Sequence, residues 1–116
     1  MVMKKLMVCA LLSGMTMTCQ ATGVHWQYLD GSADGSFKAY VDTNSLNRKK
    51  HTGMIREVSS FANGKRLSTD YRIYEANCQT DQYRVISRNG KAMDGYWNTV
   101  NPNSIGASIY RWLCGQ

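Results

Sequence analysis

The chain has little of what most enzyme classes need. It contains two histidines, one proline and eight acidic residues in 116, and it shows no glycine-rich phosphate loop, GxSxG elbow or paired-carboxylate motif. His25 lies in an expected strand and His51 follows a basic run, and neither has the neighbouring carboxylates or thiols that a metal site requires. We therefore expect a protein that is not an enzyme and that carries no metal or cofactor.

Long apolar runs are also scarce. The clearest one, Leu6–Leu12, follows Lys4 and Lys5 and precedes small residues. It is well short of the roughly 20 residues that a membrane-spanning helix needs. This order of charge, apolar run and small residues predicts a signal peptide for export from a bacterial cytoplasm.

The expected cleavage junction follows the small residues. Cys19 and Ala21 occupy the −3 and −1 positions of an A-x-A-like site. We expect cleavage between Ala21 and Thr22, which divides the chain into a signal peptide at 1–21 and a single β-rich domain at 22–116.

A lipid anchor is the alternative for this segment. A lipoprotein would carry its acyl chains on Cys19, but Thr16–Thr18 makes a poor lipobox. A membrane attachment is expected only if Cys19 is lipidated. In either case the expected location is the periplasm or the outer-membrane surface of a Gram-negative bacterium.

Two cysteines remain after the signal peptide is removed. An oxidising compartment then favours a disulfide between Cys78 and Cys114. The chain-entropy model assigns a bond that closes a loop of this length roughly 4 kcal/mol of stabilisation. The same bond would leave no free thiol as a nucleophile.

The remaining pattern predicts an α+β fold. Alternating residues and turn signals predict an antiparallel sheet of about six strands, with Asn63–Gly64 as a hairpin turn. A helix is expected to begin after Pro102, at Asn103 or Ser104, and to end at Gly115, with one apolar stripe. The helix should pack on the sheet and be tethered by the disulfide. The expected strands are 24–29, 37–41, 54–61, 66–76, 82–87 and an irregular one at 92–97.

Alternate residues of a strand point to opposite faces of the sheet. This alternation, with the apolar stripe of the helix, divides the aromatic and nearby arginine side chains between core and surface. The residues expected inside are Tyr71, Tyr83 and Trp112, and those expected in an exposed patch are Arg72, Tyr74 and Arg84. Tyrosine, tryptophan and arginine are enriched at interfaces, so an unidentified protein partner is the expected ligand.

The positive charge suggests where such a partner would bind. The chain carries 14 basic and 8 acidic residues, a formal net charge of +6. Charge clusters in two expected turns, and these supply the candidate binding patch. Its residues are Arg48, Lys49, Lys50, Lys65 and Arg66. Export argues against nucleic acid as the partner.

The region after the signal peptide resembles the bacterial surface-adhesin protein E family. The segment YVDTNSL is close to the family's YVDT-x-S-I pattern, with leucine in place of isoleucine, and the end of the chain is similar to its P-x-S-I…C-G ending. The matching residues are Trp26, Tyr40–Leu46, Tyr74–Cys78, Tyr83–Ser87, Pro102–Ile105 and Cys114–Gly115.

The resemblance implies a half-barrel-like antiparallel sheet with a C-terminal helix tethered on its concave side. It also implies an envelope location, homodimerisation and, for the named member, adhesion to host matrix and serum proteins. The matching motifs are structural, so no binding residues are carried over. The leading hypothesis is an exported, non-catalytic binding protein, and the alternative is a periplasmic structural or accessory factor of an envelope assembly.

Overall fold

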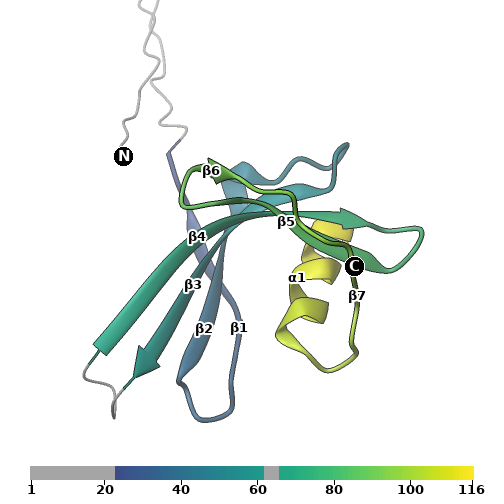
Figure 1. Cartoon of the computed structure of the whole chain (residues 1–116). Coiled ribbons are helices and arrows are strands. Elements are labelled where there is room, and N and C mark those ends of the chain that lie inside the picture. Colours follow the sequence, from purple (N-terminus) through teal and green to yellow (C-terminus); the bar gives the residue numbers. More distant parts are fainter. Residues whose placement is uncertain (1–22, 62–65) are drawn as a thin grey trace, which may run out of the picture.

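A computed structural model of the chain describes residues 23–61 and 66–116 (Figure 1). The expected signal peptide, its Ala21–Thr22 junction and Cys19 lie outside the described residues, as do the Asn63–Gly64 turn and Lys65.

The architecture is an antiparallel sheet with one C-terminal helix. The strands run in the order β1-β2-β3-β4-β5, each antiparallel to the next, and β6 and β7 both pair with β5. In the part of the chain that the structure describes, this sheet does not close. The elements are β1 Trp26–Gly31, β2 Phe37–Asp42, η1 Thr43–Ser45, β3 Thr52–Phe61, β4 Arg66–Asn77, β5 Gln82–Arg88, β6 Lys91–Ala92, β7 Asn98–Thr99 and α1 Ile105–Cys114.

The expected fold class and the first five strands are confirmed, and the sixth strand is corrected. The segment 92–97 is not one strand, because only the short β6 and β7 pair with β5. Between them the chain still follows β5, and the Met93 amide donates to the Ile86 carbonyl over 2.9 Å. A Cβ at Gly95 would collide with the Val85 carbonyl oxygen. The backbone therefore comes so close to β5 at this point that only glycine fits.

The YVDTNSL segment joins the first three strands. Asp42 is buried, and its Oδ1 accepts from the His25 and Asn44 backbone amides over 2.9 and 3.0 Å. The Ser45 hydroxyl donates to the Asp42 carbonyl and accepts from the Met54 amide. The YVDTNSL segment thus has a structural role, because its hydrogen bonds turn the chain from β2 through η1 towards β3.

Helix α1 begins after Ser104, one of the two predicted start residues, and ends before Gly115 as predicted. The Ser104 side chain accepts from the Ala107 amide over 3.0 Å, as an N-cap residue does, and Gly115 has a φ of 75°. The buried residues of the helix are Ala107, Ile109, Tyr110 and Leu113.

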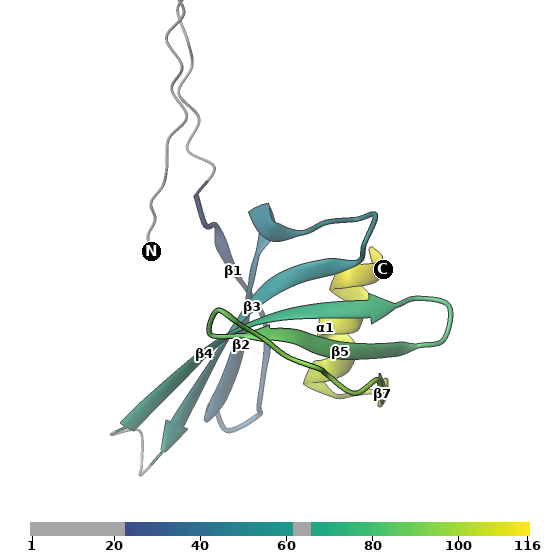
Figure 2. The same cartoon turned by 45° about the horizontal axis from the view of Figure 1, so that its top comes forward.

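The helix lies on one face of the sheet, against β1, β4 and β5 (Figures 1 and 2). Its close approach also depends on Gly53 of β3, because a Cβ there would lie 2.5 Å from the Trp112 ring. The core between helix and sheet includes Ala39, Val41, Ile55, Tyr74, Ala76, Ile109, Tyr110 and Leu113.

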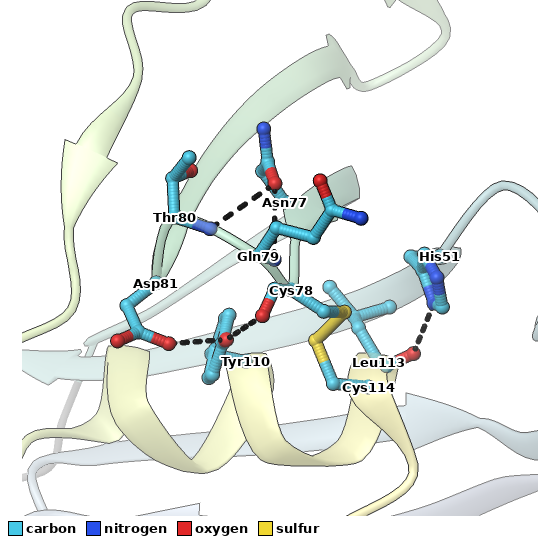
Figure 3. The surroundings of a disulfide bond; sticks show 9 residues. All are labelled: His51, Asn77, Cys78, Gln79, Thr80, Asp81, Tyr110, Leu113 and Cys114. Atoms are coloured by element: carbon cyan, nitrogen blue, oxygen red, sulfur yellow. Dashed lines mark hydrogen bonds between the residues drawn. A yellow bond between two sulfur atoms is a disulfide. The ribbon is translucent and has the colours of Figure 1, made fainter.

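The predicted disulfide is present, with Cys78 and Cys114 joined at a Cα–Cα distance of 5.9 Å (Figure 3). It connects the segment just after β4 to the last residue of α1. The Tyr110 hydroxyl adds a polar contact beside it, since it donates to Asp81 Oδ1 over 2.7 Å. Burial, with the nearby Asp81 carboxylate, raises the pKa of Tyr110, so this hydroxyl stays a donor at physiological pH.

We expect the double substitution Cys78→Ala/Cys114→Ala to lower the free energy of unfolding by about 2–5 kcal/mol, because the unfolded chain regains the entropy of the open loop. Urea unfolding of the oxidised protein and of the variant measures the difference. Adding a reductant should destabilise the wild type and leave the variant unchanged. Equal midpoints for the oxidised protein and the variant would contradict this role of the bond.

Candidate functional site

The helix divides the sheet into two unlike faces. We call the face that packs against α1 the covered face, and the opposite one the open face. Directly paired residues of antiparallel strands share a face, so Ala39, Ile55 and Tyr74 mark the covered face. The open face is marked by Tyr40, which pairs with Arg56, and by Arg56 itself, which pairs with Tyr71.

Four aromatic rings and one arginine form a continuous line across the open face. Starting in the middle, the Arg56 guanidinium carbon lies 4.8 Å from the Trp26 ring centroid and 4.5 Å from that of Tyr40. Outward from these, Tyr71 lies 6.0 Å from Trp26, and Tyr28 lies 5.6 Å from Tyr40, measured between ring centroids. We call this set the aromatic row: Trp26, Tyr28, Tyr40, Arg56 and Tyr71.

The two ends of the aromatic row are open to solvent. Tyr28 is 55% exposed and Tyr71 is 43% exposed, while the middle members are half-buried. Arg56 stacks between two rings, and its buried Nε has no hydrogen-bond partner among the described residues. Cation–π contacts of this kind contribute about 0.5–2 kcal/mol each. The row is therefore held in place by its own contacts while it exposes aromatic surface.

The structure reverses the expected faces of β4. Tyr71 was expected inside and is exposed, whereas Tyr74 was expected outside and is only 5% exposed. Both faces of this strand carry aromatic and apolar residues, so alternation alone does not tell which one the helix covers. Cys78 follows the parity of Tyr74 and bonds to the helix, and this is the signal that identifies the covered face.

The other residues assigned by parity are bound within the sheet. Arg72 lies on the covered face and pairs with Glu57 and Asp70 over 3.5 and 3.2 Å. Arg84 pairs with Glu75 over 2.8 Å and stacks on Trp97. The exposed patch expected from Arg72, Tyr74 and Arg84 is thus wrong. Tyr83 and Trp112, both expected inside, are half-buried against the core.

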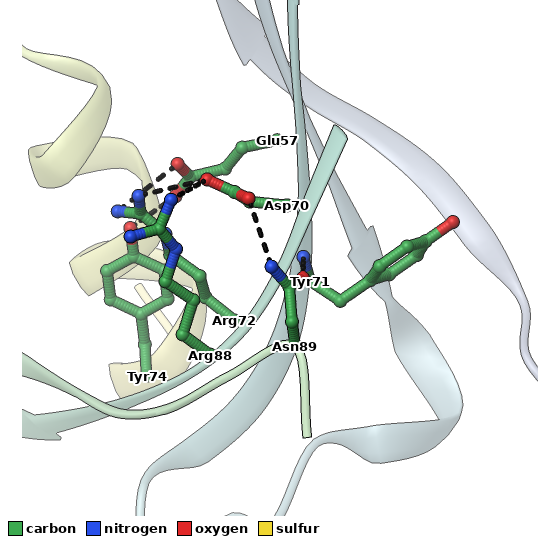
Figure 4. Close-up of polar contacts among 7 residues, drawn as sticks. All are labelled: Glu57, Asp70, Tyr71, Arg72, Tyr74, Arg88 and Asn89. Atoms are coloured by element: carbon green, nitrogen blue, oxygen red, sulfur yellow. Dashed lines mark hydrogen bonds and ion pairs between the residues drawn. The ribbon is translucent and has the colours of Figure 1, made fainter. Parts of the chain in front are cut away.

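A polar network occupies the covered face beyond the helix (Figure 4). The Tyr74 hydroxyl donates to the buried Glu57 carboxylate, and burial, together with that carboxylate, raises the pKa of Tyr74. Asp70 accepts from Asn89 Nδ2 over 3.2 Å and pairs with Arg88 over 3.0 Å. Figure 4 shows Tyr71 pointing away from this network, to the other side of the sheet. The network joins β3, β4 and the turn after β5, and we assign it to stability.

The basic candidate patch is split by the fold. Arg48, Lys49 and Lys50 lie in the turn before β3, while Arg66 pairs with Phe61 at the opposite end of that strand. At about 3.3 Å per residue, a ten-residue strand separates the two by roughly 30 Å. Lys65 lies outside the described residues. The five residues therefore do not form one surface.

The basic turn borders a shallow groove of about 390 Å³ beside the disulfide. Its lining includes Lys49, Lys50 and His51 of this turn, together with Asn77, Gln79 and Trp97. Arg48 instead lies over the C-terminal end of α1, where a Cβ on Gly115 would be 2.8 Å from its Nη1.

Both histidines have local contacts. His25 Nδ1 lies 2.9 Å from Thr43 Oγ1, and His51 Nδ1 lies 3.3 Å from the Leu113 carbonyl oxygen. Within residues 23–61 and 66–116, no group of three or more histidine, cysteine, aspartate or glutamate side chains is placed to hold a metal ion. No helix in these ranges is both long and apolar enough to cross a membrane.

Comparisons with protein-family models, with curated proteins and with solved structures give no match for this chain. The candidate site is therefore defined by its geometry, which provides an exposed aromatic row on the open face and a separate basic groove.

The polar network should make the protein sensitive to acid. The Asn89 hydrogen bond, with Arg88 and Arg72 nearby, lowers the pKa of Asp70. A lowered pKa means that the unfolded chain takes up the proton first, so the stabilisation is complete above about pH 4 and is lost as the pH falls further. We expect Asp70→Asn to cost about 1 kcal/mol at pH 7 and to reduce the loss of stability below pH 4.

Urea unfolding at pH 7, 4 and 3 measures both effects. The control is Asp94→Asn, at an exposed aspartate with no ion pair or hydrogen bond among the described residues. An acid response of Asp70→Asn identical to that of the wild type would refute the contribution of Asp70.

Proposed function

We propose that this chain is an exported, non-catalytic binding protein of the bacterial envelope, and that it binds a protein partner through the aromatic row. The observation that carries the proposal is the exposure of Tyr28 and Tyr71 at the ends of a line that contains Trp26 and Arg56. Tryptophan, tyrosine and arginine are the residue types that dominate binding energy at protein interfaces.

The contacts within the row and its place on the sheet support the same proposal. The rings are fixed against one another before a partner arrives, so binding orders few further side chains. The row also lies on the face that the helix leaves open, where its exposed ends can be reached by a partner. The resemblance to the surface-adhesin protein E family makes host matrix and serum proteins the first partners to test.

Export is supported by the pattern at the N-terminus and by the disulfide. Structural disulfides persist in oxidising compartments such as the bacterial periplasm and are rare in the cytosol. The bond between Cys78 and Cys114 therefore fits a protein that folds after export.

We expect Tyr28→Ala and Tyr71→Ala each to weaken binding to a matrix or serum protein by tenfold or more, because each removes an exposed ring from the row. Biolayer interferometry against a panel of immobilised matrix and serum proteins measures the affinities. Tyr96→Ala is the matched control, because Tyr96 is 87% exposed but lies outside the row. Unchanged unfolding midpoints would show that the variants stay folded.

Two results would count against the row. If every panel protein that binds the wild type also binds both variants with unchanged affinity, the row is not the contact surface. If the panel does not bind at all and the chain instead co-purifies with an envelope complex after cross-linking in cells, the accessory role replaces the adhesive one.

We expect the intact protein from native cell envelopes to have the mass of a chain that starts at Thr22. Mass spectrometry with and without reduction tests this expectation, and reduction should add about two daltons for the disulfide. The mass of a chain that starts at Cys19 and carries acyl chains would show that the protein is a lipoprotein and not a soluble periplasmic domain. The mass of a chain that still starts at Met1 would contradict the predicted removal of the signal peptide.

A further inference from the structure

The groove beside the disulfide has a composition different from that of the aromatic row and does not take part in the function proposed above. It combines two lysines, a histidine, two carboxamides and one tryptophan around a volume of about 390 Å³. That volume lies in the range of small-ligand sites. We propose that this groove binds an anionic saccharide, through one or two sugar units that carry a carboxylate or a sulfate.

The charge of the groove is positive and uncompensated. Lys49 and Lys50 have no acidic partner within ion-pair distance among the described residues, because the ion pairs found there involve other cations. Glu75, the acidic residue that lines the groove, pairs with Arg84 over 2.8 Å, so its charge is already balanced. The groove therefore attracts an anion.

The turn that carries the lysines is structurally defined. Asn47 Oδ1 accepts from the backbone amides of Lys49 and Lys50, each over 3.0 Å. His51 follows with a φ of 56°, and its carbonyl accepts from the Ala76 amide over 2.9 Å. The backbone that carries Lys49 and Lys50 is thus attached to β4 and is ordered without a ligand.

Trp97 gives the groove an aromatic surface. Trp97 is 38% exposed, and the Arg84 guanidinium lies 4.4 Å from the centroid of its ring. This contact and the Glu75 ion pair hold the indole in place. An aromatic face attracts positively polarised C–H groups, which a pyranose ring presents on its less polar side. A sugar unit can therefore lie on Trp97 while its acidic group is directed to the lysines.

The two carboxamides that line the groove, Asn77 and Gln79, suit hydroxyl groups. Asn77 Oδ1 accepts from the Gln79 and Thr80 amides over 3.1 and 3.3 Å, which leaves the Asn77 amide nitrogen as a donor. Figure 3 shows the Asn77 and Gln79 side chains on the side of the disulfide away from α1. Neutral donors beside an aromatic ring distinguish this groove from a plain cationic surface and favour a saccharide over an acidic peptide.

The test uses the oxidised protein and four probes in isothermal titration calorimetry. These are a heparin tetrasaccharide, which carries sulfates, a tetragalacturonate, which carries only carboxylates, maltotetraose, which is neutral, and a tetraglutamate peptide. We expect both anionic saccharides to bind, with maltotetraose and the peptide at least tenfold weaker. Comparing the first two probes shows whether sulfate or carboxylate is preferred.

Matched variants then locate the site. Lys49→Ala/Lys50→Ala and Trp97→Ala should each weaken binding of the anionic saccharides at least tenfold. Lys38→Ala/Lys91→Ala removes the same charge from exposed positions outside the groove, and Tyr96→Ala removes an exposed ring next to Trp97, so both should stay within twofold of the wild type. The aromatic-row variants should also bind the saccharides normally.

Three outcomes would overturn the proposal. The first is no binding of either anionic saccharide at millimolar concentration. The second is equal binding of tetraglutamate together with an unchanged Trp97→Ala variant, which would leave only charge attraction. The third is an equal loss in the two lysine pairs, which would mean that net charge rather than the groove is responsible.

Discussion

The link between Cys78 and Cys114 is the constraint on which the arrangement of the domain depends. A sheet of this kind has two faces, and here both of them carry aromatic side chains. The helix is ten residues long, and isolated helices of that length are marginal in water. The bond fixes its last residue beside the end of β4 and so determines the face on which it can pack. The covered core and the open aromatic row both follow from that choice.

The short distance between the helix and the sheet also requires glycine at two positions. At Gly53 a side chain would meet Trp112, and at Gly106 it would meet the Tyr83 hydroxyl. Gly106 costs helix propensity of roughly 1 kcal/mol relative to alanine. The close contact with Tyr83 explains why glycine is nevertheless present. The loss of helix propensity at this position is accepted because only glycine lets the helix pack this closely on the sheet.

Much of this architecture could be predicted from the sequence because its signals are local. Ser104 and Gly115 bound the helix, two cysteines remain outside the expected signal peptide, and turn residues separate the first five strands. The face of β4 could not be predicted from alternation, since Tyr71 and Tyr74 are chemically alike. The division of 92–97 depends on contacts with β5 that a local pattern does not contain. The aromatic row depends on register across four strands, and its central Arg56 carries no sequence signal of its own.

An exposed aromatic face on an open sheet would normally promote association with other sheets. In this chain a charge opposes such association, because the Arg56 guanidinium lies between Trp26 and Tyr40 within the row. A partner that covers the row removes the half-buried Arg56 guanidinium further from water, so it must supply a hydrogen-bond acceptor for that charge. Nonspecific apolar surfaces lack such an acceptor and gain less from covering the row than a protein with a suitably placed carbonyl or carboxylate. The aromatic rings therefore contribute affinity, and the arginine among them contributes selectivity.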